Sequence, residues 1–120
     1  MKKLLMTVLV AIFTLVISLA LIAAKAPEKV TVKEYAKKKP PVTFSHKAHA
    51  KKFGCKECHH KWKGKGTPQK CSKCHKVKKE GKKPDAKKAY HKNCRGCHRK
   101  MKKAGKKTGP TACKQCHKGK

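Results

Sequence analysis

The chain has 120 residues and carries 35 Lys and Arg against only 5 Asp and Glu, which gives a formal net charge of +30. All leucines and isoleucines lie within the first 22 residues, so residues 25–120 contain neither. The few large apolar side chains in that part cannot offset the entropy of ordering a backbone, about 1–2 kcal/mol per residue. These figures exclude an ordinary hydrophobic core, so the chain is either disordered or folded around something other than protein.

The N-terminal segment is typical of a secretory signal peptide. A basic start, Met1–Lys3, precedes an uncharged apolar stretch from Leu4 to Ile22, and small residues around Ala24 suit cleavage. We therefore expect residues 1–24 to be a signal peptide and residues 25–120 to form one domain in the periplasm. The apolar stretch is longer than that of most signal peptides, so an uncleaved membrane anchor is the alternative.

Two short runs with alternating apolar side chains follow, at residues 30–32 and 42–44. Their period of two, with a lysine-rich stretch and two prolines between them, predicts a small two-stranded β-hairpin. The segments 61–66 and 77–83 are rich in lysine and glycine and are expected to be exposed loops. The predicted fold class is therefore a small, mostly irregular or α-helical domain with a short N-terminal hairpin.

Two helices are predicted from the signals at their ends. Proline suits the first turn of a helix, so Thr67–Pro68 is expected to begin a short helix that runs into Cys71. Pro84–Asp85 is expected to begin a longer helix that continues to about Lys103 and is ended by Gly105. Each of these helices would carry one of the cysteine motifs.

The cysteines form a repeat in which every C-x-x-C pair is followed directly by a histidine. This pattern is the attachment signature of c-type haem. Two thiols on one helical turn can form thioethers with the two vinyl groups of a porphyrin, and the next residue then directs its imidazole at the iron. We predict that four haems are attached covalently, through Cys55, Cys58, Cys71, Cys74, Cys94, Cys97, Cys113 and Cys116.

Paired cysteines have two other common uses. Secreted cysteines often form disulfides, and C-x-x-C pairs build zinc ribbons, for which the fifteen residues between Cys97 and Cys113 are a suitable spacing. Neither use needs a histidine after every pair, so haem attachment is favoured. A zinc ribbon in so basic a chain would suggest a nucleic-acid-binding module, and this is the alternative that haem attachment displaces.

The number of histidines matches the number of axial positions on four irons. The chain has 8 histidines, of which half lie in the C-x-x-C-H motifs. Four haems with two imidazole ligands each need all of them, and Met101 is the one competing ligand downstream of the signal peptide. We predict that the axial ligands are His59, His75, His98 and His117 from the motifs, with His46, His49, His60 and His91 from outside them.

The sequence resembles the class III cytochromes c, the tetrahaem cytochrome c3 family with its three-haem c7 relatives. The resemblance is carried by Pro41–His49, by the doubled His59-His60 and by the three later C-x-x-C-H motifs. The doubled histidine is the mark of the tetrahaem members, whereas the short spacing inside the second and fourth motifs is closer to c7. The resemblance implies a multihaem c3-like fold organised around four covalent haems, with Phe44 packed on haem.

The resemblance also implies how the axial ligands pair. The expected pairs, for haems I to IV in the order of their motifs, are His46/His59, His60/His75, His49/His98 and His91/His117. The last pair is difficult, because a continuous α-helix would place His91 about 20° from His98 and so direct it at haem III. The family pairing therefore requires a break in the helix near Lys92–Asn93.

These sites predict electron transfer and no enzymatic activity, because an iron with two imidazole ligands has no open position for substrate. Histidine ligation without methionine, together with exposed haems, predicts low reduction potentials. A terminal reductase that passes electrons to metal ions or oxyanions is the alternative function. We expect no specific nucleic-acid partner, and membrane contact only through the N-terminal segment.

The large positive charge predicts acidic redox proteins as partners. The resemblance suggests hydrogenase, formate dehydrogenase, or membrane and outer-membrane multihaem cytochromes. Docking is expected on the lysines around haem IV, namely Lys100, Lys102, Lys103, Lys106, Lys107, Lys114 and Lys118.

Overall fold

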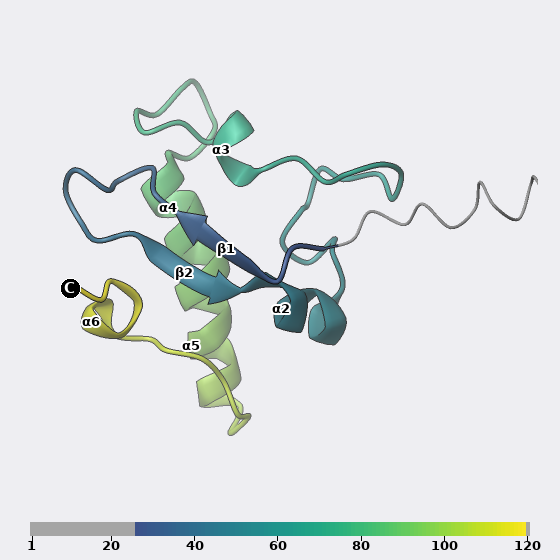
Figure 1. Ribbon diagram of the computed structural model, residues 1–120, viewed down its shortest axis with the longest axis vertical. Coiled ribbons are helices and arrows are strands. Elements are labelled where there is room, and N and C mark those ends of the chain that lie inside the picture. The colour runs from purple at the N-terminus through teal and green to yellow at the C-terminus, as the bar shows by residue number, and fades with distance from the viewer. Residues whose placement is uncertain (1–25, 120) are drawn as a thin grey trace, which may run out of the picture.

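The computed structural model describes residues 26–119, which form one small sheet and a set of helices (Figure 1). The predicted signal peptide, residues 1–24, lies outside the described residues. Across residues 26–119 no helix is both long enough and apolar enough to cross a membrane.

The N-terminal hairpin is present, as predicted. Strands β1 (Lys29–Val32) and β2 (Val42–Ser45) pair antiparallel, with Val30 opposite Phe44. Thr31 lies opposite Thr43, and their hydroxyl oxygens are 2.8 Å apart. Because side chains alternate along a strand, the valines and Phe44 share one face of the hairpin and the threonines the other. The apolar side chains of the hairpin therefore form one face, next to the histidines that follow β2.

Two short helices carry or precede the first haem motifs. Helix α2 (His46–Phe53) follows β2 directly and ends at Gly54, whose φ of 75° suits glycine. Helix α3 (Cys71–Cys74) begins later than predicted, since residues 67–70 are not helical. The expectation of a helix from Thr67–Pro68 was wrong because this segment stays extended up to Lys70 (ψ 145°), and the Gln69 carbonyl faces His59 instead of continuing a helical turn.

The longer predicted helix is confirmed at both ends. Helix α4 (Ala86–Tyr90), the π-helical segment η1 (His91–Arg95) and helix α5 (Gly96–Lys103) follow one another without interruption. At the start, Asp85 accepts a hydrogen bond of 2.8 Å from the Lys88 backbone N–H. At the end, Gly105 has a φ of 66°, and the next N–H donates to the Met101 carbonyl at 2.9 Å. The last helix, α6 (Cys113–Cys116), carries the fourth motif.

The packing between these elements leaves little protein interior. Ala86 is the only residue of the described part with a buried apolar side chain, while Phe53 and Val77 are 40% and 49% exposed. In Figure 1 the short helices α2, α3 and α6 are spread around the hairpin and the long helix. The elements therefore serve mainly to position cysteine and histidine side chains, as expected because residues 25–120 contain no leucine or isoleucine.

Candidate haem-binding sites

Each motif histidine directs one ring nitrogen at a backbone carbonyl. The Nδ1 atoms of His59, His75, His98 and His117 lie 3.0, 2.9, 2.8 and 2.8 Å from the carbonyl oxygens of Gln69, Pro84, Pro110 and Pro40. A carbonyl can only accept, so Nδ1 is the protonated nitrogen and Nε2 keeps a lone pair for a metal. Hydrogen bonds of this kind fix the tautomer and the ring orientation of metal-ligating histidines.

These carbonyls were missed by the sequence analysis. A backbone carbonyl has no side-chain signature, and the only available signal was that three of the four belong to prolines. The bond from His117 to Pro40 joins residues 77 positions apart and ties the fourth motif to the end of the turn between β1 and β2. The imidazoles are therefore oriented by the folded path of the backbone.

Every motif histidine also has a second histidine opposite it. The distances between ring centroids are 6.1 Å for His46–His59, 6.1 Å for His60–His75, 6.3 Å for His49–His98 and 6.3 Å for His91–His117. With a metal–imidazole bond of about 2.0 Å and about 1.1 Å from nitrogen to ring centre, two imidazoles on opposite sides of one iron have centroids about 6.2 Å apart. All four distances match this spacing, and the structure thus brings together both members of each pair that the family resemblance implies.

The partner of His91 is decided by the π-helical segment that begins with it. The Gly96 N–H donates to the His91 carbonyl, a bond across five residues, whereas the backbone at Tyr90 and Gly96 keeps ordinary helical angles. A π turn contains about one residue more than an α turn, so residues after it are rotated by about 100° relative to an uninterrupted α-helix. The π turn therefore separates the direction of His91 from that of His98.

The expected break at Lys92–Asn93 is corrected by this finding. The helix continues through both residues, and the wider turn supplies the rotation that a break was expected to supply. His91 consequently faces His117, and His98 is left to face His49. Burial lowers the pKa of His91, with His117 and Arg95 adding to the shift, which favours the neutral imidazole that a metal requires.

Phe44 lies between the histidines of two different pairs. Its ring centroid is 6.0 Å from that of His46 and 5.5 Å from that of His49, edge-on in both cases. His49 is further held by its Nδ1, which lies 2.7 Å from the Ser45 carbonyl, while the Nδ1 of His46 is buried without a partner. The aromatic ring therefore supports two imidazoles at once, at the point where the first and third predicted haems would meet.

Four cysteines, one from each motif, lie within electrostatic reach of one another. All eight cysteines are free. Although solvent still reaches Cys94, the surrounding protein raises its pKa to about 11, and repulsion from Cys58, Cys71 and Cys116, one from each of the other motifs, adds to the shift. Groups attached to these cysteines would accordingly lie close together.

Glycine at position 109 lets the backbone approach the third motif closely. A Cβ atom there would lie 2.6 Å from Cε1 and 2.9 Å from Nε2 of His98. These distances are shorter than van der Waals contact, so only glycine fits beside the ring in this position. Gly109 is a second feature of the site that the sequence analysis did not anticipate.

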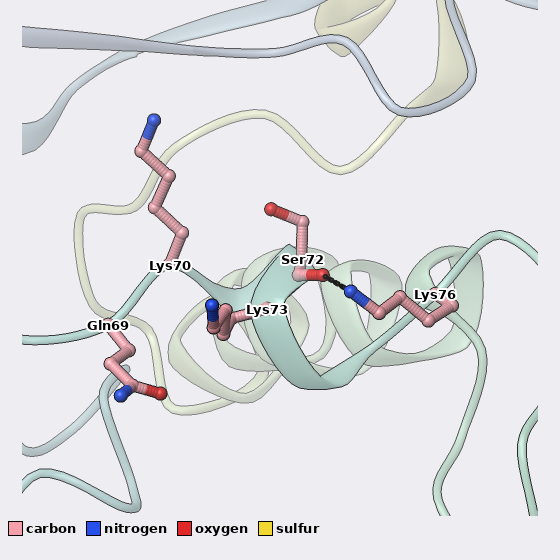
Figure 2. Close-up of a pocket in the computed structure, with 5 residues that line it drawn as sticks. All are labelled: Gln69, Lys70, Ser72, Lys73 and Lys76. Atoms are coloured by element: carbon pink, nitrogen blue, oxygen red, sulfur yellow. Dashed lines mark hydrogen bonds between the residues drawn. The ribbon is translucent and has the colours of Figure 1, made fainter.

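The outer side of α3 is basic and hollowed. Figure 2 shows the lining residues of a hollow of about 470 Å³, namely Gln69, Lys70, Ser72, Lys73 and Lys76. The Lys76 ammonium donates to the Ser72 carbonyl at 3.2 Å, while Lys70 and Lys73 extend from the same surface. Ser72 and Lys73 lie between the two cysteines in sequence and so point to the other side of the helical turn. The surface of α3 opposite the two cysteines of the second motif is therefore positively charged.

The described side chains do not gather into a site of the zinc type. Within residues 26–119 no group of three or more His, Cys, Asp or Glu side chains could hold one metal ion. The imidazoles meet two at a time instead, and each pair includes the histidine of one C-x-x-C-H motif. This arrangement, with Nε2 available on the motif histidines, is that of a multihaem c-type cytochrome.

Comparisons with known proteins give the same class and a family. The sequence profile of the Class III cytochrome C family matches residues 20–117. Cytochrome c3 of Maridesulfovibrio salexigens is 49% identical over 88 residues (66% of this chain, 79% of the relative), and cytochrome c3 of Desulfovibrio desulfuricans is 47% identical over 105 residues (80% and 89%). The chain belongs to the class III cytochrome c family.

The fold agrees with this assignment. The di-tetraheme cytochrome c3 from Desulfovibrio gigas has a similar crystal structure, with a TM-score of 0.64 at 33% identity, over 78% of this chain and 97% of that one. The chain therefore has a multihaem cytochrome c3-like fold, binds haem c and is an electron-transfer cytochrome.

Proposed function

We propose that the chain is a periplasmic, low-potential electron carrier that holds four haem c groups. The observation that carries the proposal is the set of four histidine pairs at 6.1 to 6.3 Å, each built on one C-x-x-C-H motif. In each site the two cysteines of the motif would form the thioethers, and the two histidines would hold the iron from opposite sides. When bound, haem iron supplies one-electron exchange between its ferric and ferrous states.

The histidine pairs favour electron transfer over catalysis as the function of the sites. Two imidazoles in every site leave no coordination position for a substrate, so the chain is a carrier and not an enzyme. Carbonyl hydrogen bonds hold each motif imidazole in one orientation. Histidine on both sides, without methionine, supports a low potential. The electrostatic reach between cysteines of all four motifs supports rapid electron exchange within the chain.

The proposed partners are acidic redox proteins such as hydrogenase, formate dehydrogenase or multihaem cytochromes of the membranes. Their docking surface would be the basic end of the long helix together with α6, where seven lysines are all exposed: Lys100, Lys102, Lys103, Lys106, Lys107, Lys114 and Lys118. A surface of one charge sign raises association rates with an oppositely charged partner. Export to the periplasm is supported by the N-terminal sequence.

The proposal is tested by counting haems and examining their spin state. A pyridine haemochrome assay, combined with the mass of the intact protein, should give four covalent haems per chain. The oxidised protein should be entirely low-spin, and the reduced protein should not bind carbon monoxide rapidly. A stoichiometry below four, or a persistent high-spin component, would contradict the assignment of all eight histidines as ligands.

A further inference from the structure

Glu34 is one of only five acidic residues in the chain, and it is held differently from the others. Glu28 forms an ion pair of 3.4 Å with Lys47, and the side chains of Glu28 and Lys47 are 68% and 61% exposed. Asp85 caps α4, and Glu57 and Glu80 are exposed. Glu34 forms no salt bridge in the described part of the chain.

The carboxylate of Glu34 is instead bound by a tyrosine of the long helix. The Tyr90 hydroxyl donates to Oε1 of Glu34 at 3.2 Å, across 56 positions of sequence, and Oε2 is buried without a partner. The neighbouring Tyr35 donates to the Val77 carbonyl at 2.7 Å. The segment that follows β1 is therefore fixed against both α4 and the chain that leaves α3.

Glu34 lies beside the chain that leaves the second motif. Val77, which binds the hydroxyl of the neighbouring Tyr35, comes three residues after Cys74. The start of the long helix is joined to the same chain, because the Ala86 N–H donates to the Lys76 carbonyl at 2.8 Å. Burial raises the pKa of Cys71, and the charge of Glu34 is among the further causes, as expected of a carboxylate near the motif whose two cysteines would carry the second haem.

We propose that Glu34 is a tuning residue, which lowers the reduction potential of the haem attached to Cys71 and Cys74 relative to the other haems. This inference rests on the proposed function. Reduction adds one electron to an iron and so removes one positive charge, and a nearby carboxylate favours the more positive, oxidised state. The many lysines raise the potential at all sites. Glu34, partly shielded from water and free of a lysine partner, opposes that effect at one site.

The experiment compares the holoprotein with three variants: Glu34→Gln, Glu34→Asp and Glu80→Gln. Glutamine keeps an oxygen that can accept from Tyr90 but removes the charge, aspartate keeps the charge, and Glu80→Gln removes an equal charge from an exposed turn. A redox titration followed by NMR, which resolves the haem methyl signals, measures each potential separately. In Glu34→Gln the equilibrium constant for reducing the second haem should rise roughly tenfold, about 59 mV for one electron, and the other haems should change less.

The controls decide between tuning and a structural effect. In Glu34→Asp the second haem should stay closer to its wild-type potential than in Glu34→Gln, and Glu80→Gln should give no comparable shift at any haem. The inference is overturned if Glu34→Gln shifts no haem more than Glu80→Gln does, or if Glu34→Asp reproduces the full shift. Haem stoichiometry and spin state are measured on the same samples. Fewer than four haems in the wild type would contradict the proposed function. Four low-spin haems with no shift of the second haem's reduction potential in Glu34→Gln would contradict only the tuning role.

Discussion

Substitution of Gly109 by alanine should disrupt one haem site and leave the others intact. The new Cβ would lie 2.6 Å from Cε1, 2.9 Å from Nε2 and 3.2 Å from Nδ1 of the His98 ring. Ordinary contact begins near 3.4 Å, so the ring has to move by about 0.8 Å, a small-to-large change of the kind that costs roughly 1–3 kcal/mol. His98 cannot move away freely, because its Nδ1 is bound to the carbonyl of Pro110, the residue after Gly109.

A displacement of this size is large compared with a metal–imidazole bond of about 2 Å. We expect the third haem to remain attached through Cys94 and Cys97 but to lose His98 as a firm ligand. Electron paramagnetic resonance of the oxidised variant should then show one high-spin haem in four, and the reduced variant should bind carbon monoxide at one site. Gly119→Ala is the matched control, because nothing lies within 4 Å of a Cβ at that position.

Two results would refute the reasoning about Gly109. One is a Gly109→Ala protein that stays entirely low-spin and does not bind carbon monoxide. The other is a Gly119→Ala protein with the same high-spin fraction, which would show that the response does not come from contact with His98.

Three further predictions concern the π turn, the missing core and the charge. His91→Ala should remove one ligand of the fourth haem, whose other ligand would be His117, and carbon monoxide should bind there. Binding at the third haem would instead show that the π turn does not direct His91. Lys92→Ala is the control. Protein made without haem should show little ordered structure by circular dichroism, because almost no apolar side chain is buried without the cofactor, and a cooperative thermal transition would contradict this. Electron transfer with an acidic partner, followed by stopped flow, should slow steeply between about 10 mM and about 500 mM salt, as the Debye length falls from roughly 30 Å toward a few ångströms. A rate that does not depend on salt would rule out steering, and charge reversal at Lys102 and Lys106 without effect would place the docking surface elsewhere.

Local features of the chain were sufficient to predict the haem chemistry and several elements of the fold. Repeated C-x-x-C-H motifs predict haem attachment because thioether formation needs two thiols on one turn and a histidine next to them. Alternation at residues 30–32 and 42–44 predicts the hairpin, which is observed with Val30 opposite Phe44. The cap at Asp85 and the glycine at 105 predict both ends of the long helix, because helix ends are governed by hydrogen bonds between residues only a few positions apart.

The orientation of the imidazoles could not be predicted in this way. A period of 3.6 residues places His91 beside His98, and no local residue pattern announces the π turn that separates them. The carbonyl of Pro40 that holds His117 lies 77 positions away, so its contribution exists only once the hairpin and the C-terminal segment are folded together. The start of α3 was likewise misplaced because the Gln69 carbonyl faces the first motif. The histidine pairs join separate segments of the chain, and their geometry depends on how the whole backbone folds.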